Sequence, residues 1–418
     1  MIHRDASRWL ACIALLVPLA CSAQEPRGIT LGQAIERTLS GSPELAERDA
    51  EVSAAQARAE RDALSPPFTV GAELENFAGS GSLRGVDGAE ATLRLGRLIE
   101  LGGKRNARRA VGDAEIARQR NLGEIAKVEA ASRTRLRFVE VLADQLRLTV
   151  AREHVEMARR ARAEVARAVE SARNPETDLH AADIALADAE LELEHADHEL
   201  AAARVSLASS WGGRTADFDE ALGSLDDLPT AESLEMLTAH LDNSPWARDA
   251  QLHSEVLVAK RRVAETSGVP DLSATLGVRR VEGLGEQAVV MSVSLPLGTR
   301  SRAALDLREN ESLREARHHR RASAQADSYR QLFEKYQELQ HARSELEALR
   351  ERMLPAAQKS LALAQHGFDA GRFAYQALAV SQERWVELQR RRIDSAARFH
   401  TLLAEIDLLG AATPGESP

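Results

Sequence analysis

Residues 182–207, ADIALADAELELEHADHELAAARVSL, decide the fold, because alanine and leucine alternate along them at steps of four and three. The repeating positions are Ala182, Leu186, Ala189, Leu193, Ala196, Leu200, Ala203 and Leu207. Such steps place these side chains on one face of an α-helix, where alanine lets a second helix approach closely and leucine fills the gaps. Most of the other positions are charged or polar. The stretch therefore predicts one helix of a coiled coil.

Two longer runs have the same character. Residues 104–173 contain no proline, and residues 300–369 contain only Pro355. A run of about 70 residues would form a helix about 105 Å long, which needs packing partners along its whole length. The composition agrees, since 28% of the residues are charged and only 4% are aromatic, as in coiled coils. The net charge of −10 argues against nucleic acid as a partner.

The chain reads as two copies of one unit, and similar landmarks recur at offsets of about 200 residues. The matched pairs are Ser42-Pro43 with Ser244-Pro245, Pro66-Pro67 with Pro270, Gly102 to Arg105 with Gly298 to Arg300, and Asn174-Pro175 with Ala370-Gly371. We expect a first repeat over residues 29–211, a linker over 212–231, a second repeat over 232–410 and a disordered tail over 411–418. The expected long helices span 104–173 and 300–369, and the helices that follow them span about 176–210 and 374–409.

Each repeat also contains two segments in which apolar and polar residues alternate, about 68–77 and 89–98 in the first and 271–281 and 287–296 in the second. Period two predicts strands, and their length suits tilted membrane strands. The alternative is a pair of soluble hairpins packed on the helices. The expected fold is therefore mainly α with a small β part.

Four strands are too few to close a cylinder, and an unpaired strand edge is costly in lipid. Three copies would supply twelve strands, an even number within the range of outer-membrane barrels. The same symmetry would close the coiled-coil hairpins into a helical barrel. We therefore expect a homotrimer whose β-barrel contacts outer-membrane lipid.

The first 23 residues resemble a signal peptide, with Arg4 and Arg8 before an apolar run from Trp9 to Ala20. Two outcomes remain open. A signal peptidase could cut before Gln24, or Cys21 could be the lipidated residue of a lipoprotein.

Several short segments between residues 29 and 410 resemble the TolC-like outer-membrane efflux proteins. The matching segments are Ile29-Thr30-Leu31, Ser42-Pro43-Glu44-Leu45, Leu101-Gly102-Gly103-Lys104-Arg105, and Gly371 with Tyr375, Leu378 and Gln382. The string from Leu101 to Arg105 is similar to the heavy-metal (cobalt–zinc–cadmium) branch. The chain departs from the family at Asn174-Pro175-Glu176, where a glycine is common, at Thr299, which replaces a second glycine, and at Ser42 and Ser244, which replace asparagine.

The resemblance implies an outer-membrane channel of a Gram-negative bacterium that extends into the periplasm. It would be a passive exit duct for an inner-membrane, proton-driven RND-type pump and a periplasmic adaptor, and the branch suggests divalent heavy-metal cations as substrates. Two other functions stay open: a type-I secretion or drug-efflux duct of the same fold, and a periplasmic coiled-coil scaffold without a pore.

The candidate site is the pair of helix reversals at residues 172–180 and 368–376. The resemblance implies that these tips form the periplasmic gate and meet the adaptor. The candidate residues are Asn174, Pro175, Glu176, Asp178, Asp369, Gly371, Arg372, Phe373 and Tyr375. Asn174, Pro175 and Gly371 would break the helices, and the carboxylates could form rings that favour cations. The alternatives are ordinary helix capping for Asp178 and local packing of the turn for Arg372, Phe373 and Tyr375.

No enzymatic motif stands out. His195 and His198 lie beside Glu194 and Glu199, but a zinc site needs three or four converging ligands, so a solvated helix face is favoured. His318-His319 has the same interpretation. Residues 98–105 lack the first glycine and the final serine or threonine of a phosphate loop. We expect no cofactor, no resident metal and no catalytic residue.

Overall fold

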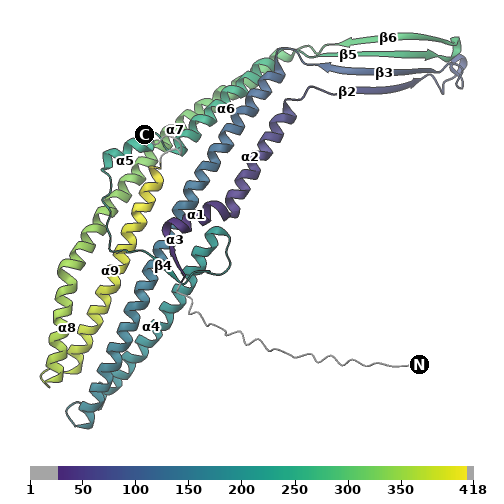
Figure 1. Cartoon of the computed structure of the whole chain (residues 1–418). Coiled ribbons are helices and arrows are strands. Elements are labelled where there is room, and N and C mark those ends of the chain that lie inside the picture. Colours follow the sequence, from purple (N-terminus) through teal and green to yellow (C-terminus); the bar gives the residue numbers. More distant parts are fainter. Residues whose placement is uncertain (1–26, 412–418) are drawn as a thin grey trace, which may run out of the picture.

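The computed structural model describes residues 27–411, which form a long helical part with a small sheet at one end (Figure 1). The expected signal peptide, Cys21 and all of the expected tail except Ala411 lie outside the described residues. None of the helices in residues 27–411 combines the length and the apolar character that crossing a membrane requires.

The helices follow the same order in both halves of the chain. The first half contains α1 (Leu31–Gly41), α2 (Pro43–Asp62), α3 (Lys104–Glu170) and α4 (Glu176–Ala208), and the second contains α5 (Leu234–Leu241), α6 (Pro245–Ser267), α7 (Thr299–Ala348), α8 (Leu354–Asp369) and α9 (Tyr375–Leu409). Pro43 and Pro245 occupy first-turn positions, where a missing amide hydrogen costs nothing. The Ser244 hydroxyl also accepts a hydrogen bond from the Ala247 amide, at 3.3 Å.

The second long helix is interrupted. A π-helical segment, Leu349–Met353, separates α7 from α8, so the expected single helix over residues 300–369 needs this correction. Pro355 accounts for the position of this π-helical segment, because its ring displaces the preceding turn and it has no amide hydrogen to donate. The deformed turn remains packed, since the Leu349 side chain is fully buried in a cluster with Ala357 and Leu388.

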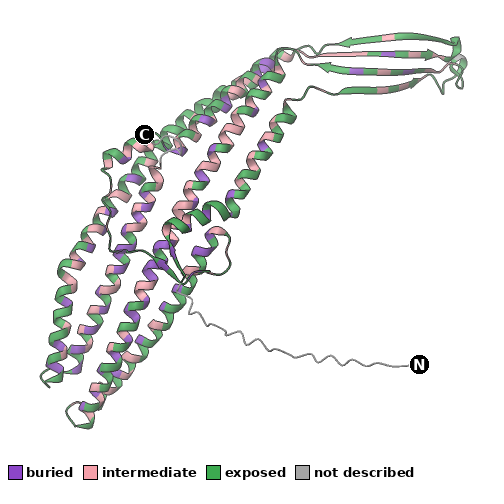
Figure 2. Cartoon of the chain, viewed as in Figure 1, coloured by how far each residue is buried: buried purple, intermediate pink, exposed green. Residues whose placement is uncertain are grey.

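The helices form a curved layer, in which one half lies near the sheet and the other lies toward the far end. Near the sheet, α2 packs on α3, α3 on α6 and α6 on α7. Toward the far end, α4 packs on α3, α3 on α9 and α9 on α8. The buried residues follow the seams between these helices, and exposed residues cover the remaining faces (Figure 2). The helix α3 therefore packs in both halves of this layer.

A second, very short sheet marks the middle of the molecule. β1 (Gly28–Thr30) and β4 (Glu220–Leu222) pair in parallel beside the largest buried cluster. The Gln145 side chain on α3 accepts a hydrogen bond from the Ala221 amide at 2.8 Å. Part of the 212–231 segment is therefore attached to the helices.

The main sheet is antiparallel, in the order β2 (Phe68–Glu75), β3 (Glu90–Ile99), β5 (Leu272–Val281) and β6 (Glu286–Ser294). The two halves of the chain meet where β3 pairs with β5, for example at Leu95 opposite Leu276. The outer strands β2 and β6 each have one edge that pairs with nothing in the described part of the chain.

The two faces of this sheet differ in chemistry. Paired residues lie on the same face, so the register assigns one face the exposed side chains of Val70, Leu74, Leu93, Leu95, Leu276, Val278, Val289, Met291 and Val293. The other face carries ion pairs between Arg94 and Glu73 and from Arg279 to Glu75 (3.0 Å) and Glu90 (2.8 Å). One face is thus suited to an apolar surrounding and the other to water.

Candidate functional site

The first tip reverses the chain between α3 and α4. Ala172 has a left-handed φ of 54°, and the Arg173 amide donates to the Ala168 carbonyl oxygen at 2.8 Å, which is the pattern of a helix C-terminus. Pro175 is the N-cap of α4 and makes no side-chain cap bond. Asp178 instead accepts a hydrogen bond from the Asn174 side-chain amide at 2.8 Å.

The second tip uses a glycine for the same purpose. Gly371 has a φ of 67°, and the amides of Arg372 and Phe373 both donate to the Gly367 carbonyl oxygen, at 2.8 and 3.1 Å. The Phe373 ring covers Gly367, where a Cβ would lie only 2.2 Å from the ring carbon Cδ2. Phe373 is nevertheless 50% exposed, so the turn presents an aromatic surface next to the exposed Arg372.

Tyr375 is positioned differently. It is only 4% exposed and packs against the Phe368 ring in a cluster that includes Val165 of α3. Burial, and secondly the charge of Asp178, raise the pKa of the Tyr375 hydroxyl. Tyr375 is therefore a neutral packing residue that joins the α3–α4 pair to the α8–α9 pair, and its ring does not lie on the surface.

The two tips together enclose a cleft of about 770 Å³. Its lining includes most of the candidate residues: Asn174, Pro175, Asp178, Asp369, Gly371, Arg372 and Phe373. Glu176 and Tyr375 do not line it. The structure thus brings together residues from two distant parts of the chain.

Polar contacts between the α3–α4 and α8–α9 pairs were missed by sequence reasoning. Gln365 of α8 donates from Nε2 to Oε2 of Glu164 on α3 at 2.7 Å, and within its own helix to Oδ1 of Asp369 at 3.0 Å. Further from the tip, Arg390 donates to both carboxylate oxygens of Glu192, and His154 contacts the same carboxylate at 3.0 Å. These residues lie on polar faces that carry no periodic signal, so the sequence alone gave no reason to select them.

The Glu192 carboxylate is held in its charged form. Burial by itself would raise its pKa, but the hydrogen bonds and charge of Arg390, with a contribution from His154, lower it below the ordinary 4.5. A carboxyl whose pKa is depressed in the folded state adds stability above its unfolded pKa and loses that contribution as the pH falls through its folded pKa. The contact between the helix pairs should therefore weaken below about pH 4.5.

Replacing Glu192 by glutamine should destabilise the protein by about 1 kcal/mol at neutral pH, because the pair is roughly 40% exposed and water screens it. The difference from wild type should shrink as the pH falls through the lowered pKa of Glu192, because the wild-type carboxyl then also gains a proton. Denaturation at neutral pH and at a series of acidic pH values measures it. Glu190→Gln is the matched control, since Glu190 lies on the same helix and makes only an exposed 3.5 Å contact with Arg159. An equal loss in both variants would contradict a specific role for Glu192.

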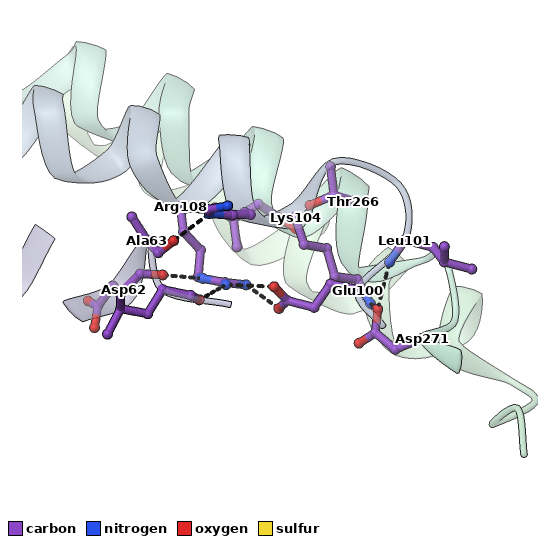
Figure 3. Close-up of polar contacts among 11 residues, drawn as sticks. Asp62, Ala63, Glu100, Leu101, Lys104, Arg108, Thr266 and Asp271 are labelled. Carbon is purple, nitrogen blue, oxygen red and sulfur yellow. Dashed lines mark hydrogen bonds and ion pairs between the residues drawn. The ribbon is translucent and has the colours of Figure 1, made fainter. Parts of the chain in front are cut away.

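A second polar network joins the sheet to the helices (Figure 3). Lys104 donates from Nζ to Oδ1 of Asp271 at 2.7 Å, and the Leu101 amide donates to the same oxygen at 3.2 Å. Arg108 binds both carboxylate oxygens of Glu100, at 2.5 and 2.8 Å. The string from Leu101 to Arg105 is therefore a joint between the strands and the long helices, and Asp271 ties it to the second half of the chain.

The histidines that the sequence analysis considered as metal ligands make other contacts in the structure. His195 contacts Glu199 of its own helix at 3.1 Å and is 73% exposed. His318 and His319 contact each other through their rings. Among residues 27–411 there is no group of three or more side chains that could hold a metal ion.

Comparisons with known proteins agree with this geometry. Residues 34–213 match the family described as outer membrane efflux protein. The cobalt-zinc-cadmium resistance protein CzcC of Cupriavidus metallidurans is 28% identical over 295 residues, which cover 68% of each chain.

Solved structures share the fold over nearly the whole chain. A membrane protein from Pseudomonas aeruginosa gives a TM-score of 0.78 at 14% identity, covering 93% of this chain and 91% of that one. CusC gives 0.75 at 14% identity, covering 91% and 92%, and the outer membrane protein VceC from Vibrio cholerae gives 0.73 at 18% identity, covering 92% and 96%. The chain therefore resembles the outer membrane efflux proteins over residues 34–213, and it shares the fold of CusC and VceC over nearly its whole length.

Proposed function

We propose that this chain is an outer membrane efflux protein and forms one protomer of a homotrimeric, passive exit duct, which receives substrates from a proton-driven RND-type pump in the inner membrane through a periplasmic adaptor. One observation carries the proposal. Within residues 27–411, the sheet and both halves of the helical layer end in free edges, of which only the one at α7 is partly covered, by the short helix α5, and these edges are arranged in the same order.

On one side the edges are β2, α2 and α4, all from the first repeat, and on the other they are β6, α7 and α8, all from the second. Joining β6 of one copy to β2 of the next would therefore also join α7 to α2 and α8 to α4. With four strands per copy, three copies give twelve, which is within the range of outer-membrane barrels. An open edge in lipid would leave backbone groups without partners.

The two faces of the sheet support a duct over a scaffold without a pore. A lipid-facing barrel needs an apolar outer face and a polar inner face. The face with Leu93, Leu276 and Met291 is apolar and exposed, while Arg94 and Arg279 lie on the opposite face in ion pairs. A soluble scaffold would have no use for so large an exposed apolar surface.

We assign the periplasmic gate and the adaptor contact to the cleft between the tips. Arg372 and Phe373 are exposed there and can meet a partner, whereas Tyr375 holds the helix pairs together from within. The carboxylates of Asp178 and Asp369 line the cleft, and three copies would repeat them around the axis, where they would favour cations.

We propose divalent heavy-metal cations as the substrates. The support is the relative named for cobalt, zinc and cadmium resistance, together with the Leu101–Arg105 string. Drug efflux and type-I secretion are the competing roles. A strain that lacks the gene should become more sensitive to these metals, and unchanged metal tolerance with new sensitivity to organic compounds would favour drug efflux.

The duct itself is tested by extracting the full chain with detergent and measuring its mass and its conductance in planar bilayers. We expect a species of three copies that requires detergent and conducts ions. A monomer that stays soluble without detergent would eliminate the duct and leave the scaffold as the better explanation.

A further inference from the structure

The apolar face of the main sheet carries two arginines. Arg280, near the end of the sheet remote from the helices, donates to Glu282 at 2.7 Å. Arg97 lies toward the helix end, where the register pairs it with Phe68 on β2 and Ala274 on β5. Its guanidinium carbon lies 4.6 Å from the centroid of the Phe68 ring. Within the described residues this ring is the only group that the Arg97 guanidinium contacts by charge, hydrogen bond or ring.

The surroundings of Arg97 are apolar. Leu95 precedes it on the same face of β3 and Ile99 follows it, and both are exposed. Leu295 and Leu297 follow β6 at the same end of the sheet, and Leu297 is 90% exposed. A positive charge among such side chains is costly in a membrane unless the guanidinium reaches an anion at the interface.

The adjoining strand of a neighbouring copy does not offer that anion. In the proposed ring, β2 would pair with β6 of the next copy, whose residues on this face are Gln287, Val289, Met291 and Val293. None of them is acidic. Glu286 lies on the opposite face, because it pairs with Val281 next to Glu90. The membrane is then the best source of a partner for Arg97.

We propose that Arg97 binds the phosphate of a glycerophospholipid in the periplasmic leaflet, and that Phe68 is a positioning residue that holds the guanidinium with its ring. This inference rests on the proposed duct, in which the helix end of the sheet faces the periplasm (Figure 1). A guanidinium presents paired donors that match a phosphate. The Phe68 ring, 61% exposed, has a face for the cation and an edge for the acyl chains.

The test uses delipidated full-length protein in detergent, with phosphatidylglycerol as the probe and diacylglycerol as the matched lipid without phosphate. Native mass spectrometry counts the bound lipids. Arg97→Gln should weaken phosphatidylglycerol binding about tenfold, because a charge-assisted contact is lost. The phosphatidylglycerol binding of Arg97→Lys should lie between that of wild type and that of Arg97→Gln, since lysine keeps the charge without the paired donors. Phe68→Leu should cause a smaller loss of binding than Arg97→Gln. Diacylglycerol binding should not respond to Arg97.

Arg84→Gln is the control, because Arg84 is also exposed but lies in the loop at the far end of the sheet. Unchanged phosphatidylglycerol binding in Arg97→Gln would overturn the inference. So would an equal loss in Arg84→Gln, or an Arg97-dependent preference for lipid A, which belongs to the outer leaflet. Mass and conductance of the same samples separate the two proposals: a wild-type protein that is neither trimeric nor conducting contradicts the duct, whereas a conducting trimer whose lipid binding ignores Arg97 contradicts only this site.

Discussion

Replacing Met291 by arginine should prevent the protein from reaching the outer membrane as a trimer. Met291 is 73% exposed and lies in the middle of β6, opposite Leu276. If this face contacts hydrocarbon, an arginine at mid-membrane depth costs about 2–4 kcal/mol in each copy. Three copies would multiply that cost in a single assembly, and free edges exposed during folding would favour aggregation. The amount of detergent-extracted trimer measures the effect.

Ser292→Arg is the control for the same strand and the same substituted side chain. Ser292 is paired with Thr275, on the face that carries Arg94 and Arg279. An arginine there would enter the aqueous lumen, so the trimer should form at close to the wild-type level. Equal amounts of trimer from both variants would mean that the apolar face does not meet lipid.

The elements with a strong period could be predicted from the sequence. The alternating segments near residues 93 and 276 became β3 and β5, and the alanine–leucine repeat became α4. Their pairing could not be predicted, because Leu95 and Leu276 are far apart in the sequence and nothing in either segment specifies the register. β1 and β4 were missed because three residues are too few to show a period.

The candidate site was predictable only in part. The backbone chemistry of three residues, Asn174, Pro175 and Gly371, predicts helix breaks. The tips do lie at those positions. Which side chains would be exposed there was not visible, because burial depends on contacts between helices. Tyr375 packs inward against Phe368, while Phe373, two residues earlier, remains half exposed. The same limit applies to the contact between Glu192 and Arg390, which depends on how α4 and α9 approach each other.

Replacing Gly102 by alanine should destabilise the joint between sheet and helices far more than the same change at Gly103. Both glycines have a left-handed φ, 74° and 77°, which costs other residues about 1–2 kcal/mol. A Cβ on Gly102 would also lie 2.8 Å from Cβ and Cγ2 of Val269, whereas one on Gly103 would meet nothing within 4 Å. Overpacking of this kind adds about 1–3 kcal/mol, so we expect about 2–5 kcal/mol in total for Gly102→Ala and about 1–2 kcal/mol for Gly103→Ala.

Denaturation of the purified protein gives the loss of stability in Gly102→Ala and in Gly103→Ala, and a third variant separates the causes of these losses. Adding Val269→Ala removes the γ-methyl groups that crowd position 102 and should recover part of the loss in Gly102→Ala, but none in Gly103→Ala. Because Val269 lies two residues after the end of α6 and Gly102 lies two residues before the start of α3, such coupling would place the glycine pair at a contact between the two repeats. If Val269→Ala recovered nothing, the cost at Gly102 would come from backbone conformation alone, and the first glycine would have no more specific role than the second.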